Sequence, residues 1–134
     1  MKTQIKSLLL IDDDQDDQFF FTTALKLVSD DVELYTACNG VKALEKLGSV
    51  MPDLILLDLV MPRMNGLIFL KMIKRDRNLA HIPVVIYTSD LGIFNESELL
   101  LAGAERIISK SATLQETATK ISDLLRQASY KASA

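Results

Sequence analysis

Short apolar runs alternate with helical patterns along this sequence, and that alternation limits the possible folds more than any other feature. Short apolar runs of this kind are typical of buried parallel strands. Strands that alternate with amphipathic helices indicate an α/β fold with a parallel sheet. Four of the runs end directly in a polar group: residues 8–11 in Asp12 and Asp13, residues 54–57 in Asp58, residues 84–87 in Thr88, and residues 107–109 in Lys110.

A fifth strand, of alternating rather than continuous apolar character, completes the predicted sheet. Residues 32–37 alternate enough between apolar and polar side chains to form a strand, and a segment of helical spacing follows each of the five strands. Residues that favour helix starts precede three of these segments, at Asp14, Asn95 and Thr113. Turn or loop residues precede the other two, at Asn39-Gly40 and Asn65-Gly66. We therefore expect five strands and five helices in a single domain over residues 1–128, followed by a polar tail over residues 129–134.

The composition of the 134-residue chain narrows the classes of function. A formal net charge of -3 does not indicate the positively charged surface that is typical of nucleic-acid-binding domains. No run approaches the ~20 apolar residues that span a membrane, and the first residues do not resemble a signal peptide. Cys38 is the single cysteine and His81 the single histidine, which excludes an internal disulfide and a histidine-rich metal site. We expect a cytoplasmic protein that binds neither membranes nor nucleic acids directly.

The polar groups at the strand ends are expected to meet, because the carboxyl ends of parallel strands share one edge of the sheet. Two carboxylates about 4 Å apart repel by roughly 4 kcal/mol at an effective dielectric near 20, so a cluster of Asp12, Asp13 and Asp58 favours a bound cation. Oxygen ligands suit Mg²⁺ or Mn²⁺. Taken singly, each acid could equally end a strand or cap a helix. Thr88 and Lys110 would add a hydroxyl donor and an ammonium, both suited to phosphate.

The neighbouring acids do not form a calcium loop. With Asp12 in the first position, the glycine that such a loop requires falls on Asp17, and the closing glutamate falls on Thr23. Asp14, Asp16 and Asp17 are instead predicted to be solvated acids in the first helical turn, where negative charge complements the helix dipole. A basic group near the end of the third helix is predicted to complement its dipole in the same way: Lys71, Lys74, Arg75 and Arg77.

The order and spacing of these motifs resemble the receiver domain of two-component response regulators, of the single-domain chemotaxis-receiver type. The resemblance covers about residues 5–127, and its most specific part is Asp58 followed by Met61-Pro62 and Asn65-Gly66. It implies a flavodoxin-like, doubly wound parallel sheet of five strands in the order 2-1-3-4-5, with five flanking helices. The other matching segments are residues 10–13, 52–57, 82–88 and Lys110.

The resemblance also implies a role for each site residue. Asp58 would accept a phosphoryl group from the phosphohistidine of a sensor histidine kinase or from a phosphotransfer protein. Asp13, Asp58 and the backbone carbonyl of Val60 would bind Mg²⁺ directly, and Asp12 would hold the metal through water. The phosphoryl oxygens would contact two further side chains, Thr88 and Lys110.

Such a protein is a signalling phosphoacceptor rather than an ordinary enzyme. Weak Mg²⁺-dependent self-phosphorylation from small donors and self-dephosphorylation are expected of it. No room for an output domain is expected after about Leu125. A conformational switch would therefore pass the signal to a separate downstream effector protein.

Three positions depart from the usual pattern of the family. Ile107 stands where an aromatic ring commonly turns inward as Thr88 moves. Ser111 follows Lys110 where a proline after a cis peptide bond is usual; a cis bond before serine costs roughly 2.5–4 kcal/mol, so this bond is either trans or strained. Val60 is apolar and cannot steer a hydrolytic water, which predicts slow self-dephosphorylation.

Two other functions fit parts of the sequence. A receiver-like domain that only docks to partners would need no chemistry, but the complete set of predicted site residues argues against it. A phosphohydrolase of the haloacid-dehalogenase type also uses an aspartyl nucleophile and Mg²⁺. That type of enzyme needs a second aspartate two residues after the nucleophile, but the residue two positions after Asp58 is Val60. Asp12 and Asp14 have that spacing, but Asp16 then falls where threonine or valine belongs, and the chain is short for that fold.

Overall fold

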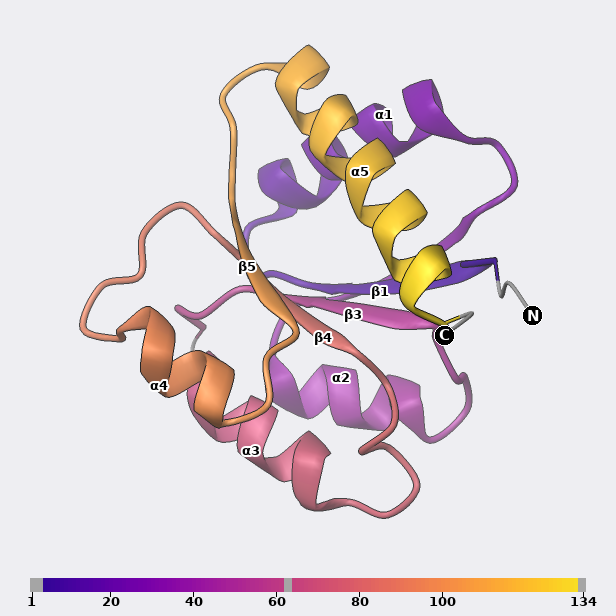
Figure 1. The fold of residues 1–134 in the computed structure, drawn as a ribbon. Helices are drawn as coiled ribbons and strands as arrows, with labels where there is room; N and C mark the ends of the chain where they lie inside the picture. Colours follow the sequence, from indigo (N-terminus) through magenta and orange to yellow (C-terminus); the bar gives the residue numbers. More distant parts are fainter. Residues whose placement is uncertain (1–3, 62–63, 133–134) are drawn as a thin grey trace.

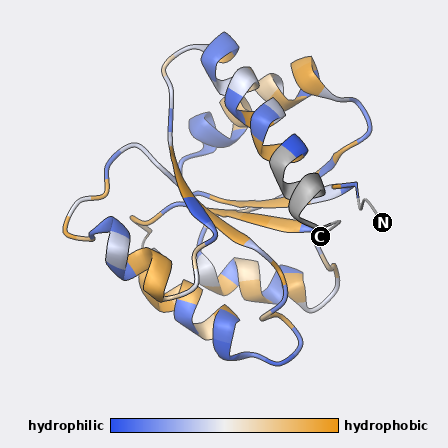
Figure 2. Cartoon of the chain, in the orientation of Figure 1, coloured by the Kyte–Doolittle hydropathy of each residue, from blue (hydrophilic) through white to orange (hydrophobic). Residues whose placement is uncertain are grey.

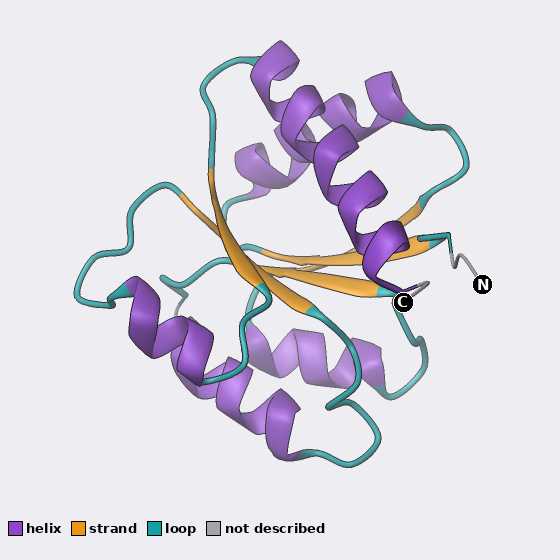
Figure 3. Cartoon of the chain, viewed as in Figure 1, coloured by secondary structure: helices purple, strands orange, loops and turns teal. Residues whose placement is uncertain are grey.

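The computed structural model describes residues 4–61 and 64–132. These residues form one five-stranded sheet flanked by helices (Figure 3). Neighbouring strands are parallel, in the order β2-β1-β3-β4-β5. This confirms the predicted flavodoxin-like fold class. Pro62 of the predicted loop motif lies outside the described residues, as do residues 133–134. The elements are β1 (Ser7–Ile11), α1 (Gln15–Val28), β2 (Glu33–Ala37), α2 (Gly40–Leu47), β3 (Leu54–Leu57), α3 (Gly66–Arg75), β4 (Val84–Thr88), α4 (Glu96–Leu101), β5 (Arg106–Ser109) and α5 (Leu114–Ala132).

Helices cover both faces of the sheet: α1 and α5 lie on one face, and α2, α3 and α4 on the other (Figure 1). Successive side chains of a strand point to opposite faces. Leu8 and Leu10 of β1 therefore join the core cluster beneath α1 and α5, whereas Leu9 and Ile11 join the cluster beneath the other helices. Because both faces are buried at the centre of the sheet, strands β1, β3 and β4 are predominantly apolar, as Figure 2 shows.

The strand register brings the polar groups to one edge of the sheet. The last residues of β1 and β3 are paired, and the Asp58 N–H donates to the carbonyl of Ile11 at 3.0 Å. Asp12 and Asp58 each follow the last residue of their strand, so they emerge side by side. Thr88, the last residue of β4, pairs with the residue before Lys110. The fold thus places the predicted site residues together at the carboxyl ends of four neighbouring elements.

Side-chain caps begin the helices where the sequence predicted them. The Asp14 carboxylate accepts from two N–H groups of the first turn of α1, and the Thr113 hydroxyl accepts from the Glu116 N–H at 3.1 Å. Helix α5 continues to Ala132, past Ser129, where the sequence placed the start of a polar tail. No helix in the described part of the chain is long and apolar enough to cross a membrane. Asparagines cap α2, α3 and α4: Asn39, Asn65 and Asn95.

Lys74 differs from the rest of the basic group predicted near the end of α3. Its ammonium donates to the carbonyls of Ala80 at 3.0 Å and Ile82 at 2.7 Å, just before β4. A Cβ atom at Gly103 would lie 2.7 Å from Cγ of Lys74, so the glycine leaves room for the lysine stem. Partial burial lowers the pKa of Lys74. Lys74 therefore joins the end of α3 to the segments that enter β4 and β5.

We expect Lys74→Ala to lower the free energy of unfolding by about 1–3 kcal/mol, because two partly buried carbonyl groups lose their donor. Urea denaturation of the two proteins measures the difference. Lys71→Ala, at an exposed position of the same helix, is the matched control and should change stability by less than about 0.5 kcal/mol. Equal effects of the two substitutions would contradict this role of Lys74.

Candidate functional site

Three aspartates meet at the carboxyl edge of the sheet. Asp12 and Asp13 follow β1 and Asp58 follows β3, and one carboxylate oxygen of each lies within 4.8 Å of the others. Asp12 and Asp58 are buried, with 1% and 8% of their surface exposed, whereas Asp13 is exposed. No other residue in the described ranges forms a hydrogen bond or ion pair with the Asp13 carboxylate. The structure thus assembles the predicted cluster, with one carboxylate open to solvent.

Lys110 lies among these carboxylates and offsets part of their charge. Its Nζ donates to Asp12 at 2.6 Å, to Asp17 at 2.9 Å and to Asp58 at 3.3 Å. An ammonium carries three N–H donors, so each of them has a carboxylate partner. Burial by itself would lower the pKa of Lys110, but the hydrogen bonds with Asp12 and Asp17 outweigh burial and the pKa is raised. Lys110 is therefore charged at neutral pH.

Asp12 is held firmly in place. Its Oδ1 accepts from the Asp14 N–H at 3.0 Å, and its backbone carbonyl accepts from Nε2 of Gln18 at 2.7 Å. Burial raises the pKa of Asp12, and the hydrogen bond from Lys110 partly opposes that rise. The charge of Asp58 raises the pKa further. A nearby positive charge therefore stabilises the ionised form of Asp12.

The Thr88 hydroxyl contacts the carboxylate of Asp58. Its Oγ1 lies 3.2 Å from Oδ1 of Asp58 and 3.0 Å from the backbone carbonyl of Asp90. A hydroxyl has one hydrogen to donate, so the two acceptors share it. Thr88 is 4% exposed and sits at the end of β4. The structure therefore places a directional donor against Asp58, as the sequence predicted.

Tyr87 and Ile107 lie on opposite faces of the sheet. Tyr87 packs in the cluster of α1 and α5, with its ring 5.6 Å from the ring of Phe21, and the Lys110 ammonium lies 5.8 Å from its centroid. Ile107 packs against the other cluster. Ile107 of β5 pairs with Ile86, the residue before Tyr87 in β4, so alternation along β4 places Tyr87 on the opposite face. Tyr87 therefore does not occupy the place of the aromatic residue that Ile107 replaces.

The Asn65-Gly66 motif lies directly behind Asp58. A Cβ atom at Gly66 would lie 2.8 Å from the backbone oxygen of Asp58 and 2.8 Å from Cα of Leu59. The Gly66 N–H also donates to the carbonyl of Leu59 at 2.8 Å. Only glycine allows this close approach of the start of α3 to the segment after β3. The spacing between Asp58 and Gly66 is thus a packing requirement of the site.

The structure describes two of the positions that depart from the family pattern, Ser111 and Val60. The described residues contain no cis peptide bond, so the Lys110–Ser111 bond is trans. The side chain of Val60 points into solvent, with 66% of the residue exposed. Val60 therefore contributes an apolar surface two residues after Asp58 and no polar side-chain group.

The donor set fits a hard divalent cation. Asp12, Asp13 and Asp58 bring three carboxylate oxygens together, and Lys110 offsets only one of their charges. Carboxylate oxygens are the ligands that Mg²⁺ and Mn²⁺ prefer, with water in the remaining positions. The exposure of Asp13 leaves access for the ion and its waters. Asp12, Asp13 and Asp58 are the side chains that would hold such a cation.

The contact between Asp17 and Lys110 corrects the prediction that Asp17 is only a solvated acid of the first turn. Asp17 is 45% exposed at its side chain, and its Oδ2 is 2.9 Å from Nζ of Lys110. The spacing of α1 contained a signal for this contact. Asp17 precedes the buried Phe21 by four residues, so both lie on the helix face that packs inward. By contrast, Asp16 is exposed, as predicted.

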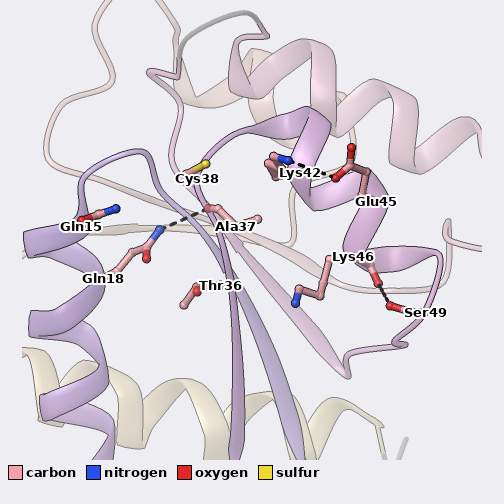
Figure 4. Close-up of a pocket in the computed structure, with 9 residues that line it drawn as sticks. All are labelled: Gln15, Gln18, Thr36, Ala37, Cys38, Lys42, Glu45, Lys46 and Ser49. Atoms are coloured by element: carbon pink, nitrogen blue, oxygen red, sulfur yellow. Dashed lines mark hydrogen bonds and ion pairs between the residues drawn. The ribbon is translucent and has the colours of Figure 1, made fainter.

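A separate cavity of about 470 Å³ lies beside the edge strand β2, between α1 and α2 (Figure 4). Gln18 and Cys38 line it, together with Lys42 and Lys46 of α2. None of the clustered aspartates lines this cavity. Two of its lining residues also contact the backbone of Asp12: the Gln18 amide donates to the Asp12 carbonyl, and the Ala37 carbonyl accepts from the Asp12 N–H. The cavity is thus distinct from the carboxylate cluster.

Comparison with known proteins defines the class of protein. The family model of the response regulator receiver domain matches residues 8–122. That match covers most of the chain, so the protein belongs to the response regulator receiver family. Receiver domains are signalling phosphoacceptors of two-component systems, and they bind Mg²⁺ or Mn²⁺ at an acidic cluster of the kind described above.

Relatives include both short and long proteins. PilG of Pseudomonas aeruginosa is 31% identical over 94 residues, which cover 70% of this chain and 68% of PilG. Response regulator PleD of Caulobacter vibrioides is 36% identical over 85 residues, 63% of this chain and 19% of PleD. Histidine kinase P4 of Formosa agariphila is 35% identical over 99 residues, 74% of this chain. The chain spans only 7% of the length of that kinase.

Solved structures agree with the fold. The phosphorylated cyanobacterial phytochrome response regulator RcpA superposes with a TM-score of 0.79 at 28% identity, covering 90% of this chain and 91% of RcpA. The Mn²⁺-bound form of response regulator Rcp1 gives a TM-score of 0.77 at 28% identity, covering 89% of this chain and 91% of Rcp1. One of these relatives was thus crystallised phosphorylated and the other with a divalent cation.

Proposed function

We propose that this protein is a stand-alone receiver that accepts a phosphoryl group on Asp58 in a Mg²⁺-dependent reaction. The donor would be a sensor histidine kinase or a phosphotransfer protein, and the signal would pass to a separate effector. The observation that carries the proposal is the arrangement around one carboxylate. Asp58 is buried, accepts from Thr88 and Lys110, and shares a carboxylate cluster with Asp12 and Asp13.

The chemistry follows from those contacts. An oxygen of Asp58 forms a bond to phosphorus as the phosphorus–nitrogen bond of the phosphohistidine breaks, and the electron pair stays on the imidazole nitrogen. The product is an acyl phosphate. Lys110 and Thr88, which contact Asp58, would donate to the oxygens of the transferred group, where negative charge must be stabilised. The protein supplies position and charge rather than an acid or base.

A divalent cation would complete the site. Asp12, Asp13, Asp58 and the backbone carbonyl of Val60 are the groups proposed to hold it. When bound, Mg²⁺ or Mn²⁺ offsets negative charge on the transferring group. Without the cation, the dianionic phosphoryl group would approach three carboxylates, and only the positive charge of Lys110 would offset the repulsion. The proposed reaction should therefore stop when the cation is removed with EDTA.

A conformational switch would begin at Thr88. Phosphorylation adds up to about two negative charges beside Asp58, and these compete with Asp90 for the single hydroxyl hydrogen of Thr88. Movement of Thr88 toward the phosphoryl group would release the carbonyl of Asp90. The segment between β4 and α4 would then favour a different conformation. Ile107 cannot follow with an aromatic swing, so the proposed readout passes through the β4–α4 segment.

Labelling with Mg²⁺ and acetyl phosphate, or with beryllium fluoride, tests the function. A receiver gains a stoichiometric label at Asp58, which is the expected result. A domain that only docks to partners gains no label. A phosphohydrolase releases phosphate catalytically instead. Either of the last two outcomes would remove the proposal.

Val60→Asn is expected to speed loss of the acyl phosphate by roughly 3- to 10-fold, because a polar side chain there can orient a water toward phosphorus. The measurement is the decay of the phosphorylated protein after the donor is removed, followed by intact-protein mass spectrometry. Val60→Ala is the control, since it shortens the side chain without adding a polar group. If the asparagine variant decays at the wild-type rate, exposure of an apolar Val60 does not set the lifetime.

A further inference from the structure

Asp17 contacts the site, yet it has no part in the phosphoryl transfer described above. It lies in the first turn of α1, whereas Lys110 follows β5. Its Oδ2 is 2.9 Å from Nζ of Lys110, and the lysine side chain is only 13% exposed. The contact therefore joins two distant parts of the chain through one carboxylate and one ammonium.

The three carboxylate partners of Lys110 are not equivalent. Asp12 and Asp58 belong to the cluster that could hold a metal ion, and Asp17 does not. A cation in that cluster draws on the same carboxylates that hold Lys110, and it repels the ammonium. The contact with Asp17 uses no oxygen of the cluster. Of the three carboxylate contacts that Lys110 makes in the described residues, only the contact with Asp17 would therefore stay in place when a cation binds.

We infer that Asp17 is a positioning residue, which holds the Lys110 ammonium beside Asp58 while a divalent cation occupies the carboxylate cluster. This inference rests on the proposed function and names a further residue of the same site. Without Asp17, the ammonium rests on Asp12 and Asp58 alone. It then competes with the cation for those carboxylates and is less often available to the phosphoryl oxygens.

Asp17→Ala tests the inference, with Asp16→Ala as a matched control. Both changes remove one negative charge from the first turn of α1, but only Asp17 contacts Lys110. Titration calorimetry with MgCl₂ should show an affinity about 3- to 10-fold lower for Asp17→Ala and less than about 2-fold lower for Asp16→Ala. The rate of labelling by acetyl phosphate at saturating Mg²⁺ should fall by a similar ratio. Equal effects of the two substitutions would overturn the inference.

A double-substitution cycle separates positioning from a general loss of charge or structure. In a Lys110→Ala background the ammonium is absent, so Asp17→Ala should lower Mg²⁺ affinity no more than Asp16→Ala does. An undiminished effect of Asp17→Ala in that background would show that Asp17 acts without Lys110, and the inference would be wrong.

The same experiments distinguish failure of this inference from failure of the proposed function. If the wild-type protein takes no label at Asp58, the proposed function fails. The calorimetric cycle still decides whether Asp17 acts through Lys110 on cation binding. If the wild type labels and the cycle shows no coupling, only the inference fails.

Discussion

Asp58→Asn is expected to reduce phosphoryl labelling by roughly 100-fold or more, because the amide cannot supply the oxygen nucleophile. Labelling is measured by intact-protein mass spectrometry after incubation with Mg²⁺ and acetyl phosphate. Stability should not fall, since the change removes one of the charges that repel Asp12 and is nearly isosteric. Urea denaturation without Mg²⁺ checks this second expectation.

Asp30→Asn, an exposed change in the α1–β2 connection, serves as the control for Asp58→Asn. It should label at the wild-type rate. Full labelling of Asp58→Asn would show that another residue is the nucleophile. Loss of labelling together with a loss of folded structure would mean that the carboxylate of Asp58 is required for folding, which the electrostatics of the site does not predict.

Asp13→Asn is expected to lower Mg²⁺ affinity by roughly 10-fold or more, since it removes a charged oxygen ligand from the cluster. Labelling at limiting Mg²⁺ should fall with it and recover partly when Mg²⁺ is raised. The fold should be unaffected, because Asp13 is exposed and its carboxylate has no partner among the described residues. Titration calorimetry with MgCl₂ gives the affinity.

Asp14→Asn is the matched control for Asp13→Asn. It removes a negative charge from the adjacent residue, and asparagine caps a helix about as well as aspartate. Its effect on Mg²⁺ affinity should be less than about 2-fold, because Asp14 is not a member of the carboxylate cluster. Indistinguishable losses in the two variants would mean that net charge, rather than ligation by Asp13, governs cation binding.

The fold could be predicted because two local signals agree along the chain. Burial of both faces of the sheet makes every strand of the parallel core apolar, so the runs ending at Asp12, Asp58 and Thr88 mark strands without reference to their neighbours. Polar caps such as Asn39 and Asn95 mark where the intervening helices begin. Both signals depend only on nearby residues. The assembly of the site then follows from the rule that parallel strands end at one edge.

The contacts of long charged side chains could not be predicted in the same way. Lys110 and Lys74 each carry a flexible stem, and which acceptors they reach depends on packing between elements distant in sequence. Lys110 reaches Asp17 of α1, whereas Lys74 reaches the carbonyl of Ile82. The helical spacing of Asp17 and Phe21 indicates an inward face, but it does not identify the partner. Such contacts require the tertiary structure.

The most direct test of the account is to locate the phosphoryl group on the wild-type protein. The protein is incubated with acetyl phosphate and either MgCl₂ or EDTA, and the adduct is mapped by peptide mass spectrometry. We expect one phosphoryl group per chain, on Asp58, in the presence of Mg²⁺, and none with EDTA. An adduct on another residue, an equal yield with EDTA, or no adduct under either condition would contradict the account.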